Sequence, residues 1–517
     1  MKAGRLIPSA ALMIAGLLAG GWLVQRAVRG GESRAAREGA VLLDKVMERV
    51  RERYVEPVDE ERLWALAMEG MLAQLGDPNT AYLTPERLAT LSRAASNSYL
   101  GVGITVDVRG GWVTVAQARA GGPAERAGVM PGDRLVEVDG RSMKGWTFEE
   151  ARNALRGPPG STVAVLLERG QGTRIKVSLE RAEIRLRSVA RVTVLDGGVG
   201  YLAVTTFSDS TEAEVTSAVD SLRSAGARSI VLDLRGNPGG LLAQGVRVAD
   251  LFLGSGKRIV TTQGRVEQAN AVYLDETAER WAELPRVVLV NHGTASAAEI
   301  VAGALQDHDR ALVVGRASYG KGSAQAIYPL DNGAALSLMN ARWYTPLGRS
   351  IEFPTPGEQR LADADTARPV FRTATGRAVY GGGGIVPDIA AGDSALIPPE
   401  RRLFAELGED GPRFAEALRA QAGTLIREGV ARDSLFRTDP AWRERLHALL
   451  SRDRVRVNPL IFDFAGPFLD RALGNEIARQ AFGPAYALRR TLREDTVIQR
   501  AADILRRAKT PRDVFTE

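Results

Sequence analysis

The 517-residue sequence contains no cysteine, which excludes disulfide bonds, thiolate metal sites and cysteine nucleophiles. It also excludes a lipid-modified N-terminal cysteine. Histidine is scarce, because the chain has only 3, at positions 292, 308 and 447. A histidine-based catalytic triad or a multi-histidine metal site therefore has little to draw on, and we expect neither a metal ion nor a cofactor. Proton transfer in this protein should use a group other than imidazole.

The chain also lacks long runs of one charge. Its 68 basic and 62 acidic residues are interleaved and leave a net charge of +6. Binding of nucleic acid would need a clustered basic patch, so we expect a mixed solvated surface and no nucleic-acid partner. At 517 residues with 44% hydrophobic content, the chain is too long for one core and should form several folded units.

One long apolar run is present, at residues 6–24, with Lys2 and Arg5 before it and Arg26 and Arg29 after it. The run is about long enough to cross a bilayer, for which ~20 residues suffice. No clean signal-peptidase site follows it. We therefore predict an uncleaved membrane anchor within residues 1–30, with a cleaved signal peptide or a buried helix as alternatives.

Two regions with different sequence patterns follow the apolar run. Residues 31–95 carry apolar side chains at helical spacing, which predicts a small helical module with these side chains in its core; they are Val41, Leu42, Val46, Val50, Leu63, Leu66, Ala67 and Met71. Residues 96–183 instead show short apolar strands separated by glycine turns.

Within the second stretch, Gly122–Gly140 resembles a PDZ domain of the type found in bacterial proteases. The resemblance implies that an extended peptide adds a strand to a sheet edge and that backbone N–H groups bind its terminal carboxylate. The residues expected to bind the peptide are Leu100, Gly101, Val102, Gly103 and Ile104. A plain glycine bulge is the alternative for this segment.

Residues 184–395 alternate between strand and helix patterns, which predicts a layered α/β unit. The expected buried strands are 199–204, 229–234, 286–290 and 311–314, and the expected helices are 211–225, 243–252 and 296–306. Residues 396–517 show helical spacing without recognisable chemistry, so we predict a C-terminal helical region of unknown role.

Three short segments of the α/β unit are candidates for chemistry. Ser296 lies at a predicted strand-to-helix junction, where the N–H of Ala297 could bind an oxyanion; helix capping through Glu299 is the alternative. Lys321 stands between two glycines and could also be an ordinary turn lysine. The run 233–240 ends a buried strand with Gly239 and Gly240, whose N–H groups could form an anion-binding nest or only a tight turn.

These segments together resemble the C-terminal processing (tail-specific) proteases, the S41 peptidase family. The matching motifs are residues 76–86, 294–300, 319–322, 344–351 and 384–388, together with Gln325. They occur in the order expected for the family, and the resemblance covers residues 41–389. It implies a crotonase/ClpP-like ββα protease core, so the predicted fold class is multidomain α/β with a β-rich PDZ domain. The chain has Ala298 where the family often has a second serine.

The resemblance also assigns roles. It implies that Ser296 is the nucleophile, Lys321 the general base and Gln325 the partner of the lysine, with Ala297 and Gly239 or Gly240 forming the oxyanion hole. A lysine accepts a proton only when neutral, although its ordinary pKa is about 10.4. Burial in a closed site lowers such a pKa by up to ~3–5 units, and a neutral amide partner does not oppose that shift as a carboxylate would.

The resulting prediction is a serine endopeptidase of the bacterial cell envelope, held on the periplasmic side of the inner membrane by residues 6–24. Its PDZ domain is expected to select proteins with apolar C-termini, and it could form a homo-oligomer. Three alternatives stay open: a catalytically silent PDZ-containing envelope adaptor, a Ser–His mechanism through His292, and acyl-CoA chemistry on the crotonase-like fold.

Overall fold

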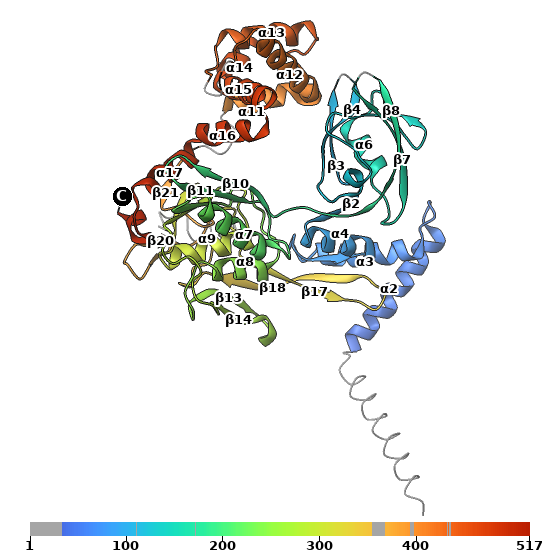
Figure 1. Ribbon diagram of the computed structural model, residues 1–517. Helices are drawn as coiled ribbons and strands as arrows, with labels where there is room; N and C mark the ends of the chain where they lie inside the picture. Colours follow the sequence, from blue (N-terminus) through green and yellow to red (C-terminus); the bar gives the residue numbers. More distant parts are fainter. Residues whose placement is uncertain are drawn as a thin grey trace, which may run out of the picture. The chain divides into compact units, whose positions relative to one another are not determined.

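The computed structural model describes residues 34–516 except 110, 171, 354–367, 393–397, 432, 434 and 435. The predicted membrane anchor lies outside the described residues. Among the residues that are described, no helix is both long and apolar enough to cross a membrane. Helices and strands are mixed along the chain (Figure 1), as expected for a multidomain α/β protein with a separate β-rich domain.

The chain divides into two compact units, and the smaller one contains the N-terminal helices. Its elements are α2 (Arg34–Arg53), α3 (Glu60–Ala73), β1 (Ala81–Leu83) and the start of α4 (Pro85–Ala95). Strand β1 pairs antiparallel with the first part of β18 (Ala335–Tyr344), for example Ala81 with Ser337. The apolar side chains of α2 are not in a core as predicted, because Val41, Leu42 and Val46 are 57%, 64% and 50% exposed.

The PDZ-like part is a small barrel of strands closed by short helices. Its sheet has the order β3-β4-β5-β7-β8, with β6 beside β5, so β3 is an edge strand. The elements are β3 (Ile104–Arg109), β4 (Trp112–Ala118), α5 (Pro123–Arg126), β5 (Arg134–Val138), β6 (Arg141–Ser142), α6 (Phe148–Leu155), β7 (Thr162–Arg169) and β8 (Thr173–Glu180). A two-stranded ribbon, β2 (Ser98–Gly101) with β9 (Ala182–Arg185), joins the two ends of this part.

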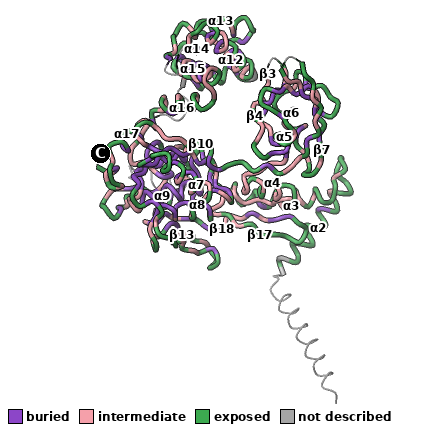
Figure 2. The backbone as a smooth tube through the Cα atoms, in the orientation of Figure 1, coloured by how far each residue is buried: buried purple, intermediate pink, exposed green. Residues whose placement is uncertain are grey.

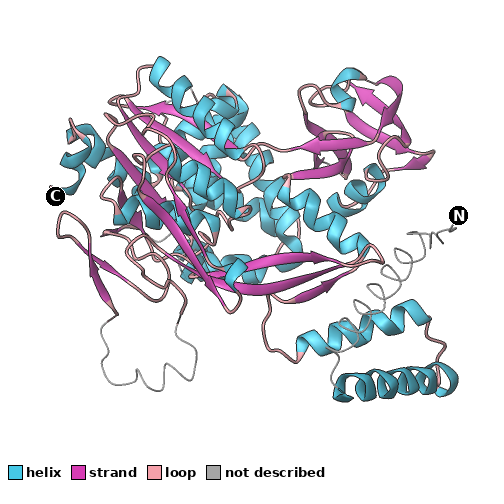
Figure 3. Cartoon of the chain, turned by 90° about the horizontal axis from the view of Figure 1, so that it is seen from below, coloured by secondary structure: helices cyan, strands magenta, loops and turns pink. Residues whose placement is uncertain are grey.

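The α/β core is built on a six-stranded sheet of order β10-β11-β12-β15-β16-β21, parallel except for β10. Figure 3 shows long strands with helices beside them. Its strands are β10 (Val189–Leu195), β11 (Val199–Val204), β12 (Ser229–Asp233), β15 (Arg286–Val290), β16 (Leu312–Gly315) and β21 (Ile389–Ala390). Helices α7 (Thr211–Ser224), α8 (Leu242–Asp250) and α9 (Ala297–Asp307) share one apolar cluster with it. Figure 2 shows how densely buried this part of the chain is.

Side chains of these strands alternate between the two faces of the sheet, as the period of a strand requires. In β12, Ile230 and Leu232 pack with α7, α8 and α9, whereas Val231 packs on the opposite face. The opposite face is covered by α17 (Thr496–Arg507), which contributes Ile498 and Leu505. Both faces are therefore buried, which explains why the strands read as continuous apolar runs.

Two further sheets contain the remaining strands. Strand β13 (Arg258–Gly264) pairs with β14 (Ala271–Leu274) on one side and with the end of β18 on the other. The other elements here are η1 (Glu267–Ala269), β17 (Ser323–Pro329), β19 (Val370–Arg372) and β20 (Ala378–Tyr380).

The C-terminal helices before α17 form two apolar clusters of their own. They are α11 (Pro398–Leu407), η2 (Gly408–Asp410), α12 (Gly411–Arg427), α13 (Ala441–Arg452), α14 (Pro459–Phe464), α15 (Gly466–Phe482) and α16 (Pro484–Glu494). After α17, η3 (Pro511–Phe515) ends the chain with Val514 in the same cluster as α17. Residues 396–517 thus contain a helical region and, after it, a helix that belongs by its packing to the α/β core.

Candidate active site

Ser296 occupies a strained turn between strand β15 and helix α9. Its backbone has φ +55° and ψ −119°, in a region that residues other than glycine rarely adopt. A helix cap does not need this geometry, because capping residues usually have extended backbones. Such strain costs about 1–3 kcal/mol and concentrates at functional sites. The same kind of strained strand-turn-helix exposes the nucleophilic serine of the α/β-hydrolases.

The capping interaction proposed for Glu299 is also present, in a modified form. The Glu299 carboxylate accepts a hydrogen bond from the Ser296 N–H at 2.7 Å, as in a capping box. The Glu299 N–H donates to the Ser296 carbonyl oxygen at 2.8 Å. Capping and catalysis are therefore compatible at this position, because the cap holds the strained backbone while the Ser296 side chain stays half-buried.

Glu299 does more than close the helix. Its side chain is fully buried and accepts further hydrogen bonds from the Ser318 hydroxyl at 2.5 Å, the Gly320 N–H at 2.7 Å and the Lys321 N–H at 2.9 Å. Burial raises the pKa of the Glu299 carboxyl group above its ordinary value, and these hydrogen bonds act in the opposite direction. The backbone nitrogens of Ser296 and Lys321 donate to the same oxygen, Oε2. One buried carboxylate thus joins the segments that carry the predicted nucleophile and base.

The two glycines beside Lys321 allow the backbone to pass close to residues 351–353. A Cβ on Gly320, where φ is +85°, would lie 2.9 Å from the Ile351 carbonyl oxygen, and one on Gly322 would lie 2.7 Å from Glu352 Cγ. Lys321 is half-buried, and its ammonium group has no hydrogen bond or ion pair within the part of the chain that the structure describes. Gln325 lies in strand β17 with an exposed side chain.

The loop 234–240 brings Gly239 against Ser296. A Cβ added to Gly239 would lie 2.7 Å from Ser296 Cβ and 3.0 Å from the Ala297 nitrogen. The Gly239 N–H already donates to Asn237 Oδ1 at 2.8 Å. Gly240 has φ +143° and is exposed, and its N–H has no partner among the residues described here.

The side chain of Asn291 and the backbone of Asn237 fix this loop to the segment before Ser296. Asn291 Oδ1 accepts hydrogen bonds from the N–H groups of Gly236 at 2.9 Å and Gly293 at 3.0 Å. The Asn237 carbonyl oxygen accepts one from the Ala295 N–H at 2.9 Å. Sequence reasoning missed Asn237 and Asn291 as well as the central role of Glu299. The spacing Ser296–Glu299 was the one signal, and it indicated only a cap.

His292 lies four residues before the predicted nucleophile but is not built into this network. Its ring is exposed and packs at a centroid distance of 6.0 Å against the ring of Tyr319. No hydrogen bond joins it to Ser296 within the described residues. The geometry gives the Ser–His alternative no support.

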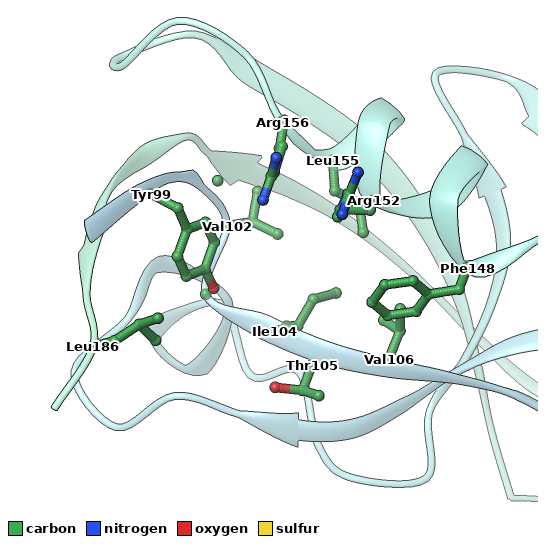
Figure 4. A pocket seen from close by; sticks show the side chains of 12 residues that line it. Tyr99, Val102, Ile104, Thr105, Val106, Phe148, Arg152, Leu155, Arg156 and Leu186 are labelled. Carbon is green, nitrogen blue, oxygen red and sulfur yellow. The ribbon is translucent and has the colours of Figure 1, made fainter. Parts of the chain in front are cut away.

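The PDZ-like part contains a separate groove of about 290 Å³ between the edge strand β3 and helix α6 (Figure 4). Of the predicted peptide-binding residues, Gly101, Val102, Gly103 and Ile104 line it, whereas Leu100 does not. Further lining comes from Tyr99, Thr105, Val106, Phe148, Arg152, Leu155, Arg156 and Leu186. The groove is mainly apolar, with two arginines on its helical side, and it lies along the edge strand β3, whose Val108 carbonyl oxygen accepts a hydrogen bond from Arg419 at 3.3 Å.

Three parts of the chain match models of known protein families. Residues 198–356 match the model of peptidase family S41, residues 114–169 match a PDZ domain, and residues 25–87 match the N-terminal domain of the activating protease CtpB.

Three relatives show how far the similarity extends. The chain is 35% identical over 309 residues to the carboxy-terminal processing protease CtpA of Bacillus subtilis (strain 168), covering 60% of this chain and 66% of the relative. It is 37% identical over 313 residues to the carboxy-terminal-processing protease of Bartonella bacilliformis, covering 59% and 71%. The solved structure of a photosystem II D1 C-terminal processing protease is 32% identical, covers 60% of this chain and 89% of that one, and gives a TM-score of 0.36.

The chain thus has a strained serine at a strand-to-helix turn, next to a glycine loop and a buried carboxylate, an arrangement that serine-type hydrolases also use. The chain belongs to the S41 family of serine-type peptidases and carries a PDZ domain. It spans about two thirds of the length of the curated relatives named above.

Proposed function

We propose that this protein is an endopeptidase in which Ser296 attacks the scissile carbonyl and Lys321 takes its proton. The observation that carries the proposal is the Glu299 carboxylate, which binds the backbone N–H groups of both residues through one oxygen. This arrangement keeps the two segments together before any substrate arrives. The acyl-enzyme would then be released by water that the same lysine activates.

For the oxyanion hole we propose the N–H groups of Ala297 and Gly240. The Gly239 N–H is occupied by Asn237, whereas the Gly240 N–H has no partner among the described residues. The role of Gly239 is to let the loop approach Ser296, since a side chain there would collide with the nucleophile. Donors placed in advance in this way stabilise the developing negative charge without reorganisation.

Lys321 is half-buried in this state, so substrate binding has to complete the removal of water around its amine. We propose that Gln325 orients the amine, as an uncharged partner suits a lysine that must lose its proton. The crotonase/ClpP-like identity of the core is part of the same proposal and is supported by the parallel sheet with Ser296 at the start of α9.

The PDZ groove supports selection of substrates through their C-terminal tails. A tail added as a strand beside β3 would present alternate side chains to Val102, Ile104 and Val106, which themselves alternate along that segment. Phe148 and Val106 stand at one end of the groove in Figure 4 and favour an apolar residue there. We further propose that the substrates are proteins of the bacterial envelope and that residues 6–24 anchor the enzyme on the periplasmic side, where it could act as a homo-oligomer.

The test is cleavage of a peptide with an apolar C-terminus by the parent chain and by Ser296→Ala, Lys321→Arg and Lys176→Met. Arginine keeps the positive charge but cannot act as a base, because it stays protonated. Loss of a general base typically lowers the rate 10²–10⁴-fold, so Lys321→Arg should cleave the peptide that much more slowly than the parent. Lys176→Met, at an exposed position in a strand of the PDZ domain, should cleave it at the rate of the parent. Parental activity in Ser296→Ala would refute the dyad.

Substrate selection needs its own test. Phe148→Ala should weaken binding of the apolar tail peptide to the Ser296→Ala chain, measured by fluorescence anisotropy, because it removes part of the groove wall. If the parent chain binds the tail peptide but cleaves no peptide, the result would instead support the alternative of a catalytically silent PDZ-containing adaptor.

A further inference from the structure

Helix α17 reaches the active-site loop through one ion pair. The Arg235 guanidinium lies 3.0 Å from the Asp495 carboxylate, and a second pair of atoms, Nη1 and Oδ1, is 3.3 Å apart. Arg235 is the second residue after strand β12 and belongs to the loop that continues to Gly239 and Gly240. Its side chain is 14% exposed and that of Asp495 is 26% exposed, so water screens this pair less than a surface ion pair.

Arg235 is also held from the side of the sheet. It donates to the Asp233 carboxylate at 2.7 Å, and the Tyr201 hydroxyl donates to the same carboxylate at 2.8 Å. Asp233 therefore fixes one side of the guanidinium and Asp495 the other. The two residues after Arg235 are then tied to the segment that precedes the nucleophile, Gly236 through the Asn291 side chain and Asn237 through the Ala295 N–H.

Asp495 lies between helices α16 and α17. It is the C-cap of α16 and the N-cap of α17, where its side chain accepts hydrogen bonds from the N–H groups of Val497 and Ile498 at 3.0 Å each. It therefore lies where α16 ends and α17 begins, next to Leu492 of α16, which packs in the same apolar cluster as α17. A displacement of the end of α16 would move the residue that pairs with Arg235.

We propose that the Arg235–Asp495 ion pair is a positioning device that couples the C-terminal helical region to the oxyanion-hole loop. Neither residue touches the substrate; both act through the placement of the loop 236–240. The proposal rests on the function given above for that loop. It assigns a role in the protease reaction to a part of the chain whose sequence shows no chemistry.

The test compares Asp495→Asn with Asp196→Asn in the full chain. Asparagine is as good a helix cap as aspartate, so Asp495→Asn removes the charge and keeps the start of α17. Asp196 forms an ion pair of 3.4 Å with Arg493 and so also joins the end of α16 to the core, but without contact to the loop. We expect kcat for the tail peptide to fall about tenfold or more in Asp495→Asn with KM and Tm close to those of the parent, because small misplacements of catalytic groups cost that much. Asp196→Asn should leave kcat unchanged.

A double-mutant cycle with Arg235→Gln separates coupling from general damage. If the pair acts as a unit, Arg235→Gln combined with Asp495→Asn should be no slower than Arg235→Gln alone. The proposal would be overturned if Asp495→Asn had the kcat of the parent, or if the losses of kcat in the two single variants added up in the double variant.

Hydrogen exchange gives a readout that does not depend on the catalytic mechanism. In the Ser296→Ala background, Asp495→Asn should speed exchange of the hydrogen-bonded amides of Gly236, Asn237 and Gly239, whereas Asp196→Asn should not. Unchanged exchange would refute the coupling even if the dyad is correct. Faster exchange in a chain whose Ser296→Ala variant still cleaves peptide would instead support the coupling and refute the dyad.

Discussion

Replacement of Glu299 by glutamine tests the organisation of the site with almost no change in volume. Oε1 accepts hydrogen bonds from the Ser318 hydroxyl and the Gly320 N–H, and Oε2 accepts them from the N–H groups of Ser296 and Lys321. A glutamine offers one acceptor atom and one NH₂ donor. Its best orientation turns the oxygen toward Ser296 and Lys321 and the NH₂ toward Ser318, whose Oγ already accepts a hydrogen bond from the Ile385 N–H and can accept a second. The Gly320 N–H and the Ser318 hydroxyl hydrogen then both lose their acceptor on residue 299.

An unsatisfied N–H costs about 1–3 kcal/mol when fully buried, and the half-buried Gly320 should lie at the lower end of that range. The Tm of the core should fall by about 2–4 °C for each kcal/mol, measured by calorimetry. The rate of cleavage should fall more than the loss of unfolding free energy explains, because the turn that contains Lys321 loses one of its hydrogen bonds to residue 299. We expect kcat for the tail peptide to decrease about 10²-fold at a temperature where the variant is fully folded.

The matched control is Glu400→Gln in helix α11. Glu400 is also buried, at 5% exposure, and pairs with Arg471 at 2.8 Å, outside the catalytic segments. This variant should lose stability but keep its kcat once folded. If Glu299→Gln has the Tm and kcat of the parent, Glu299 does not organise the site and the reasoning is refuted.

Two further predictions follow from close packing and from a buried acid. Gly239→Ala should abolish measurable cleavage, since its Cβ would meet Ser296 Cβ at 2.7 Å. Gly236→Ala, whose added Cβ meets nothing within 4 Å, should remain active with a small loss of stability from its φ of +69°. Equal activities of the two variants would contradict the packing argument. Burial and the neighbouring Asp250 raise the pKa of Asp275 from 3.8 to about 7. The folded chain then keeps a proton that the unfolded chain loses, so stability from this group is complete below pH 3.8 and is lost as the pH rises through about 7. Asp275→Asn cannot ionise and should flatten the decline in unfolding free energy measured in urea between pH 5 and 8; an unchanged slope would show that Asp275 is not the titrating group.

Much of the core was predictable from the sequence, because its strands are buried on both faces and stand out as apolar runs. Strands 199–204 and 286–290 have the expected bounds, and helix 211–225 ends one residue earlier, at Ser224. The position of Ser296 at a strand-to-helix junction was equally readable. Its φ of +55° was not, since nothing in a run of small residues indicates strain.

Features that depend on contacts between distant parts of the chain could not be predicted from the sequence. Glu299 looked like a local cap because its spacing to Ser296 is local, whereas its bonds to residues 318–321 arise only when two loops meet. The apolar face of α2 followed the helical period of a core helix, but that period says nothing about what covers the helix, and Val41 and Leu42 are exposed. Helix α17 carried no sign that it packs on a sheet whose last strand ends at Ala390.

The central claim is that Ser296 becomes acylated during turnover. Intact-mass spectrometry of the chain, quenched in acid while it turns over a peptide ester, tests this most directly. The account predicts a mass increase equal to the acyl group, located by digestion on the peptide that contains Ser296 and absent from Ser296→Ala. An adduct on another residue, or turnover of the ester by Ser296→Ala at the rate of the parent, would contradict it.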